Sequence, residues 1–256
     1  TNELLQFLDE EKNRPRFRSS SIGNLFTDPK LKRDKEAGNL SDTVQSMIEE
    51  IWLSKNYGVR GLMEVKETIK GKLCEVDAID LVQQLDESKK EFRVKNSTRL
   101  YSKWSSGECD LVLSDSIEDI KIAYDINSFF KKGKKDAYKA PDGKIHKGFT
   151  KTYYGQAQDY MRLWNKKKFT LIYVAINTPE ELLIEEEKRY YFKYNCDEEN
   201  KDYIKASKQI RANHDFLKIP LEKRIKKFTI ERDDEFLKKL DGRAANALKH
   251  YENIEL

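Results

Sequence analysis

The sequence has few of the residues that build covalent frameworks or thiolate metal clusters. It holds only three cysteines, Cys74, Cys109 and Cys196, which are odd in number and widely spaced. They cannot form a disulfide framework, and they cannot supply the four thiolates of an iron–sulfur cluster. The three histidines are isolated from one another. We therefore expect a protein of a reducing compartment, the cytoplasm, with no cluster or zinc site.

The sequence also lacks any apolar run long enough to cross a bilayer, and its N-terminus lacks a basic-then-apolar leader. We expect no membrane association. Charged residues reach 37%, but the two signs alternate and apolar runs recur, which is typical of a folded chain. The formal net charge is only +4, so binding to a polyanion would depend on where the lysines lie.

Helical and strand patterns share the chain. Its 256 residues suit one large domain of mixed α/β type. We place a core at about residues 16–178 and an extension of strand and helix at about 179–256. Helices are predicted over 1–12, 41–55, 62–88, 150–165, 198–219 and the C-terminal stretch, and one opens at Thr178, with Pro179 in its first turn and Glu181 completing a capping box. Strands are predicted within 91–126, at 168–177 and at 226–232, the last an edge strand.

Two acids draw attention in the stretch "GECDLVLSDSIEDIKIAYDINSFF". It is predicted to form two strands joined by a polar turn, with Asp110 on the first and Asp125 on the second. Asp115, Glu118 and Asp119 fall in the predicted turn and are expected to face water. Asp125 and Asn127 are two apart, so they would share one face of the strand. Neighbouring carboxylates make a hard oxygen site suited to Mg²⁺ or Mn²⁺, although acids on a hairpin are more often simply solvated.

Four segments, in order, give the chain a resemblance to a known family. "KGKLCEVDAIDLV", "GECDLVL", "IAYDIN" and "YYGQAQDYMRLW" followed by "FTLIYVAINTPEEL" resemble motifs of the PD-(D/E)xK nucleases. Within that superfamily the chain looks like the lambda-type phage exonucleases with a RecB-like nuclease fold. The resemblance implies a restriction-endonuclease-like core, in which helices flank a central mixed sheet.

The resemblance also implies a metal site. Glu75, Asp110 and Asp125 would be side-chain ligands of Mg²⁺ or Mn²⁺, and the backbone carbonyl of Ile126 a further ligand. Asn127 would stand at the position of the family's catalytic lysine. This departure predicts an impaired enzyme, unless Lys121, Lys131 or Lys132 replaces the missing charge. The chain is then either a metal-dependent exonuclease weakened by Asn127 or an inactive DNA-binding or structural relative.

The same resemblance implies DNA contacts and partners. Family members resect double-stranded DNA ends in phage recombination, often as a homo-trimer, and leave a strand for a single-strand annealing protein. Their location would be the cytoplasm of the host cell. Arg16, Arg18 and Ser20 are candidates for a 5′-phosphate pocket, and Gln156 and Tyr160 for DNA contacts. Four loop lysines are candidates for the DNA backbone, although a solvated loop has the same composition: Lys131, Lys132, Lys134 and Lys135.

Overall fold

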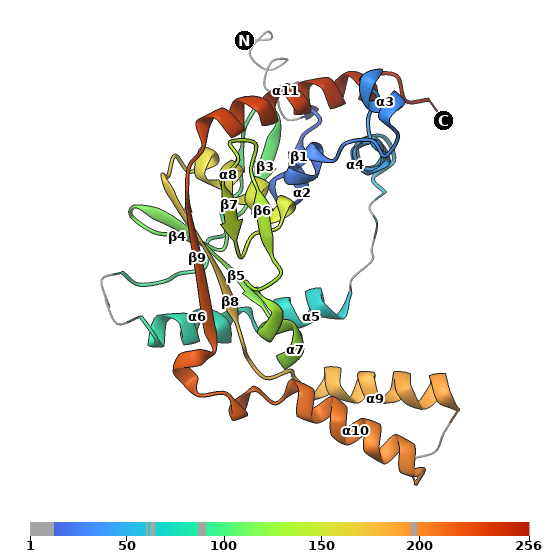
Figure 1. Ribbon diagram of the computed structural model, residues 1–256, viewed down its shortest axis with the longest axis vertical. Coiled ribbons are helices and arrows are strands. Elements are labelled where there is room, and N and C mark those ends of the chain that lie inside the picture. The colour runs from blue at the N-terminus through green and yellow to red at the C-terminus, as the bar shows by residue number, and fades with distance from the viewer. Residues whose placement is uncertain (1–12, 60, 62–64, 87–90, 196–198, 256) are drawn as a thin grey trace.

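A four-stranded mixed sheet runs through the molecule (Figure 1). The computed structural model describes residues 13–59, 61, 65–86, 91–195 and 199–255. The strands lie in the order β4 (Leu111–Val112), β5 (Ser116–Ile122), β8 (Lys168–Val174) and β9 (Ile225–Glu231). β5 and β8 are parallel, whereas β4 and β9 each run antiparallel to their neighbour. The predicted α/β class, with a mixed sheet flanked by helices, is confirmed.

Helices cover both faces of the sheet. On one face, α6 (Glu75–Gln84) packs on the strands, where Ala78 and Val82 meet Ile120 and Ile172. On the other face, α8 (Lys151–Leu163) and α11 (Asp234–Tyr251) close the larger core. Side chains two apart on a strand share a face, so successive residues of β5 serve the two layers in turn. This alternation decides which charged residues of β5 meet.

The N-terminal segment packs on α8. It forms β1 (Phe17–Arg18), α2 (Ser19–Ile22) and the 3₁₀ turn η1 (Gly23–Phe26), and β1 joins β3 (Ser105–Gly107) and β2 (Leu100–Tyr101) in a small sheet. Glycines allow the close approach to α8, since a Cβ on Gly155 would lie 2.3 Å from the Cα of Gly23. The segment is thereby held against α8 and β3.

Two helices form an arm that projects from the body of the molecule (Figure 1). They are α9 (Glu180–Tyr194) and α10 (Lys201–His214). The predicted cap at Thr178 is wrong: α9 begins at Glu180, Pro179 is its N-cap, and no side chain caps the helix. The Thr178 hydroxyl instead lies 2.7 Å from Nδ1 of His214. This contact joins the residues just before α9 to the last residue of α10.

The remaining elements follow the sequence closely. The N-cap of α4 is Ser41, as predicted, and β9 is an edge strand. The helix predicted over 62–88 is interrupted at Cys74, and Leu73 and Val76 are exposed rather than in the core. The helix predicted over 1–12 lies outside the described residues. The other elements are α3 (Lys32–Glu36), α4 (Asp42–Tyr57), α5 (Lys66–Leu73), α7 (Ile126–Lys131), β6 (Ala137–Lys139), β7 (Ile145–Lys147), η2 (Phe216–Lys218) and η3 (Leu221–Lys223).

Among the described residues, no helix has the length and apolar character that a membrane crossing requires.

Candidate active site

Two carboxylates face each other where β4 begins. The register pairs Leu111 with Glu118, so Asp110, one residue earlier, stands opposite Asp119. Oδ2 of Asp110 accepts a hydrogen bond from the backbone N–H of Ile120 at 2.8 Å, which ties the first acid to the strand of the second. Lys121, two residues after Asp119, shares its face of β5, and its Nζ lies 2.5 Å from Oδ2 of Asp119. An acid, an acid and a lysine therefore meet on adjacent strands.

Asp125 and Asn127 do not lie on the strand beside Asp110, so that prediction is wrong. β5 ends at Ile122, and α7 starts at Ile126. Asp125 is the N-cap of α7: its carboxylate accepts the backbone N–H of Ser128 at 2.6 Å, a common role for aspartate. Ile126 is the first residue of that helix, and Asn127 is exposed on it. Asp125, Ile126 and Asn127 therefore belong to the start of a helix and not to a strand.

The turn between β4 and β5 is shorter than predicted. Asp115 is exposed in it, as expected, but Glu118 and Asp119 are buried on β5, with exposed fractions of 7% and 2%. Buried acids persist when each has a cation partner. Arg93 donates two hydrogen bonds to Glu118, at 2.6 and 3.0 Å, while Lys121 neutralises Asp119. The expectation that Glu118 and Asp119 face water is therefore wrong.

Glu75 reaches this group through a lysine. It is the first residue of α6, and Lys95 Nζ donates to its Oε1 and also to Oδ1 of Asp110, the latter at 3.0 Å. The backbone N–H of Asn96 donates to the carbonyl of Asp110 at 2.8 Å, which fixes this segment beside β4. Lys95 therefore links Glu75 to Asp110, and Asp110 in turn lies opposite Asp119 with its partner Lys121.

Burial and charge set the protonation of the buried pair. Burial raises the pKa of Asp119 to about 6; the ammonium of Lys121 opposes this rise, and the charge of Asp110 adds to it. Burial alone would lower the pKa of Lys121, but the charges of Asp119 and Asp110 outweigh burial and raise it above its ordinary value. Lys121 is thus an ammonium near neutral pH. Its Nζ also lies 5.6 Å from the ring centroid of Tyr153.

The donors of this group fit a hard divalent cation. Oδ2 of Asp119 is buried and has the Lys121 ion pair but no hydrogen bond. Asp110 and Glu75 add carboxylate oxygens, the ligand type that Mg²⁺ and Mn²⁺ prefer. In the described part of the chain, no three His, Cys, Asp or Glu side chains already surround one metal position. Glu75, Asp110 and Asp119 would be the residues that hold such an ion, with Glu75 released from Lys95.

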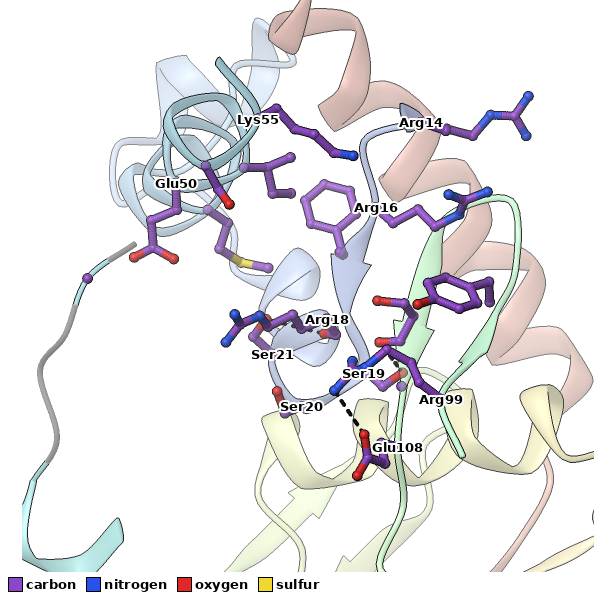
Figure 2. Close-up of a pocket in the computed structure, with 18 of the residues that line it drawn as sticks. Arg14, Arg16, Arg18, Ser19, Ser20, Ser21, Glu50, Lys55, Arg99 and Glu108 are labelled. Carbon is purple, nitrogen blue, oxygen red and sulfur yellow. Dashed lines mark hydrogen bonds and ion pairs between the residues drawn. The ribbon is translucent and has the colours of Figure 1, made fainter. Parts of the chain in front are cut away.

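A basic pocket of about 740 Å³ lies beside the N-terminal segment (Figure 2), and its lining includes Glu108, two residues before Asp110. The predicted phosphate-pocket residues Arg16, Arg18 and Ser20 all line it. The full set of charged lining residues comprises five cations, Arg14, Arg16, Arg18, Lys55 and Arg99, and two acids, Glu50 and Glu108. The excess of positive charge favours an anionic ligand.

The neighbouring serine has a structural role. Ser19 is buried, and its hydroxyl donates to Oδ2 of Asp159 at 2.5 Å. Asp159 also accepts a hydrogen bond from the Ser105 hydroxyl at 2.9 Å. This buried carboxylate therefore joins β1–α2, β3 and α8, and fixes one wall of the pocket.

The segment 108–110, which connects the basic pocket to Asp110, is held by hydrogen bonds to its three successive backbone carbonyls. The hydroxyl of Tyr160 donates to the carbonyl of Glu108 at 2.9 Å, and Gln156 Nε2 donates to the same hydroxyl oxygen at 3.2 Å. Asn96 donates from Nδ2 to the carbonyl of Cys109 at 3.0 Å and from its backbone N–H to that of Asp110. Gln156 and Tyr160 are buried, and they hold the segment that connects β3 to β4.

The lysine-rich stretch is partly ordered into secondary structure. It contains the end of α7 and the β6–β7 hairpin. Lys131, Lys134 and Lys135 are exposed, whereas Lys132 is half-buried, with its Nζ 3.7 Å from Asp136. Their contact with DNA stays a prediction.

The acid–x–lysine spacing was present in the sequence at the right place. "EDIKI" contains Asp119, Ile120 and Lys121, which have the acid–x–lysine spacing that the resemblance implies. This spacing was missed in the sequence because Glu118 and Asp119 were expected to lie in a turn. The buried thiols Cys74 and Cys109 are free of disulfides, as expected, and burial raises the pKa of Cys109 to about 12.

Solved structures resemble this fold over almost its whole length. A phage-related exonuclease from Haemophilus somnus 129PT is 27% identical with a TM-score of 0.64, and the match covers 93% of this chain and 94% of that one. The alkaline exonuclease LHK-Exo from Laribacter hongkongensis is 11% identical with a TM-score of 0.58, over 94% and 90% of the two chains. LHK-Exo in complex with dAMP gives 11% identity and a TM-score of 0.57, over 95% and 91%.

No protein-family model and no curated protein sequence matches the chain. The structural likenesses nevertheless confirm the predicted resemblance: the chain has the fold of these exonucleases and resembles the PD-(D/E)xK nucleases. Within that class it resembles the phage-type exonucleases.

Proposed function

We propose that the protein is an exonuclease that uses Mg²⁺ or Mn²⁺ to resect double-stranded DNA ends, as in phage recombination. One observation carries the proposal: Asp110 and Asp119 face each other across β4 and β5, with Lys121 beside Asp119. In this arrangement Asp119 and Lys121, rather than Asp125 and Asn127, fill the acid–x–lysine motif. The backbone-carbonyl role expected at Ile126 moves with the motif to Ile120.

Each residue has a distinct task in this proposal. A divalent metal held by Glu75, Asp110 and Asp119 would supply an activated water and neutralise charge on the scissile phosphate. Asp110 and Asp119 orient the site, since the first is tied to the strand of the second through the N–H of Ile120. Lys121 keeps its proton and donates a hydrogen bond to the attacking water or to a phosphate oxygen. Charge stabilisation of this kind contributes roughly 10²–10³-fold per donor.

The basic pocket suits the terminal phosphate of a DNA strand. Arg16 and Arg18 bring guanidinium groups, which match phosphate geometry, and Ser20 brings an exposed hydroxyl. A nucleoside monophosphate is present in the dAMP complex of LHK-Exo. The exposed Lys131, Lys134 and Lys135, together with Lys132, would contact the backbone of the duplex. A homo-trimer, a single-strand annealing partner and a cytoplasmic location complete the proposal.

An inactive DNA-binding relative is the weaker candidate. It rested on asparagine at the position of the catalytic lysine, and Asn127 lies on the exposed side of α7, away from that position. Lys121, beside Asp119 on β5, would supply the cation instead. We therefore propose an active enzyme rather than an impaired one.

Digestion of a linear duplex with a 5′-phosphate tests the proposal. With Mg²⁺, the unchanged chain should release nucleotides from duplex ends, and Asp119→Asn should lose this activity by at least about 10³-fold because a metal ligand is removed. Asp125→Asn is the matched control: asparagine is an equally good N-cap, so the helix stays intact. Loss of activity in Asp125→Asn with retention in Asp119→Asn would overturn the assignment, and no digestion by the unchanged chain would favour the inactive relative.

A further inference from the structure

We propose that Lys95 is a positioning residue whose ammonium takes the place of a divalent cation between Glu75 and Asp110 in the metal-free protein, so that a metal must displace it. Lys95 Nζ donates to one carboxylate oxygen of each acid. The inference rests on the proposed function, because it takes these two acids to be metal ligands.

The backbone of Lys95 is held in place by the strand that carries Asp110. Lys95 and Leu111 form an isolated antiparallel bridge, and the N–H of Asn96 donates to the carbonyl of Asp110 at 2.8 Å. Two residues earlier, Arg93 makes its paired hydrogen bonds to Glu118 on β5. The lysine therefore starts from a fixed point beside the site, and its side chain spans the gap from Asp110 on the sheet to Glu75 on α6.

The ammonium of Lys95 offsets the repulsion between the carboxylates of Glu75 and Asp110. Glu75 and Asp110 converge on one ammonium, and two neighbouring carboxylates repel each other. A compact cation with three donors can neutralise both. A divalent cation placed between the same oxygens would satisfy them better, because its charge is twice as large.

The exposure of their partners distinguishes Lys95 from Lys121. Lys95 is 37% exposed, and its partners Glu75 and Asp110 are 36% and 17% exposed. Lys121 is 27% exposed, but its partner Asp119 is only 2% exposed. Exposed ion pairs are weak, so Lys95 can swing into solvent at modest cost. Lys121 is held by a buried charge and stays. The two lysines thus have different roles. Lys121 keeps its position near the substrate, whereas Lys95 is displaced by the metal.

Titration calorimetry with Mn²⁺, without DNA, tests the inference. Lys95→Met removes the competing charge and should bind Mn²⁺ about 2- to 30-fold more tightly, the gain expected from two lost exposed ion pairs. Lys95→Arg keeps the charge and should remain close to the unchanged chain. Lys249→Met, at an exposed lysine in the last turn of α11, is the control for net charge and should also remain close to it.

Thermal unfolding gives an independent measure. Without metal, Lys95→Met should melt at a lower temperature because Glu75 and Asp110 repel each other, and Mn²⁺ should raise its melting temperature more than that of the unchanged chain. Lys95→Gln, which keeps a hydrogen-bond donor, serves as a second neutral variant should the methionine variant fold poorly.

Two outcomes separate this inference from the proposed function. Equal or weaker Mn²⁺ binding by both neutral variants overturns the role of Lys95, while the metal site itself stands if Asp110→Asn abolishes binding. If Asp110→Asn binds Mn²⁺ as well as the unchanged chain does, the proposed metal centre is wrong, and the inference is overturned with it.

Discussion

A fully buried lysine should make the protein more stable as the pH rises above neutrality. Lys70, on α5, has no exposed surface, and its Nζ donates to the carbonyls of Ala123 and Tyr124, both at 2.8 Å. The ring of Phe216 lies 4.6 Å from the same atom. Burial lowers the pKa of Lys70 from 10.5 to about 7, although the charges of Cys74 and Asp125 oppose this shift.

The sign of the effect follows from proton uptake. Between the folded pKa of about 7 and the unfolded value of 10.5, the unfolded chain holds more protons on Lys70 than the folded chain does. The free energy of unfolding therefore rises with pH in this window, by up to about 1.4 kcal/mol per pH unit. From pH 7 to 9 the contribution of Lys70 alone approaches about 2 to 3 kcal/mol. The buried thiols of Cys74 and Cys109 oppose it toward pH 9, because burial raises the pKa of both and they lose their protons first in the unfolded chain.

Urea unfolding of the unchanged chain and of Lys70→Met at pH 7, 8 and 9 measures this slope. The methionine variant fills similar space, but leaves the carbonyls of Ala123 and Tyr124 without their donor, so its absolute stability falls. The decisive quantity is the slope of the unfolding free energy against pH, which should be more positive for the unchanged chain than for the variant. Identical slopes would refute the argument, since the pH dependence would then arise elsewhere.

Two further predictions concern the charged residues of the site. Lys121→Met should slow single-turnover cleavage of a 5′-phosphorylated duplex by roughly 10²–10⁴-fold, while Asn127→Lys, on the exposed side of α7, should leave the rate within about twofold; the reverse pattern would restore the Asn127 assignment. Arg93→Met should lower the free energy of unfolding by about 3–5 kcal/mol, because it leaves Glu118 buried without its partner. Calorimetric melting at pH 7 measures this loss, and a change below about 1 kcal/mol would contradict it.

The sequence predicted the class of fold because its apolar periodicities are local. The helix from Ser41 and the strand at 168–177 depend on caps and alternation within a few residues, and both formed as expected. The family motifs placed Glu75 and Asp110 in one region, and the structure brings them to the same ammonium.

The second acid was misplaced for a physical reason. Glu118 and Asp119 looked like turn residues because charges seldom occupy a sheet interior. Their burial depends on Arg93 and Lys121, and the first of these partners is distant in the chain. Asp125, which did look like a strand residue, begins a helix instead. Local pattern cannot decide between a strand end and an N-cap when one aspartate suits both.

The carbonyls of residues 108–110 are each held by a hydrogen bond, and together they fix the distance between the basic pocket and Asp110. Tyr160 fixes the first, and Asn96 fixes the next two. Glu108 lines the basic pocket, and Asp110 belongs to the carboxylate group, so only Cys109 separates the two sites along the chain. A strand end seated in the pocket would present the same bond to the carboxylates at every turnover, whatever its bases. The length of each product would then be set by the protein backbone rather than by the DNA sequence.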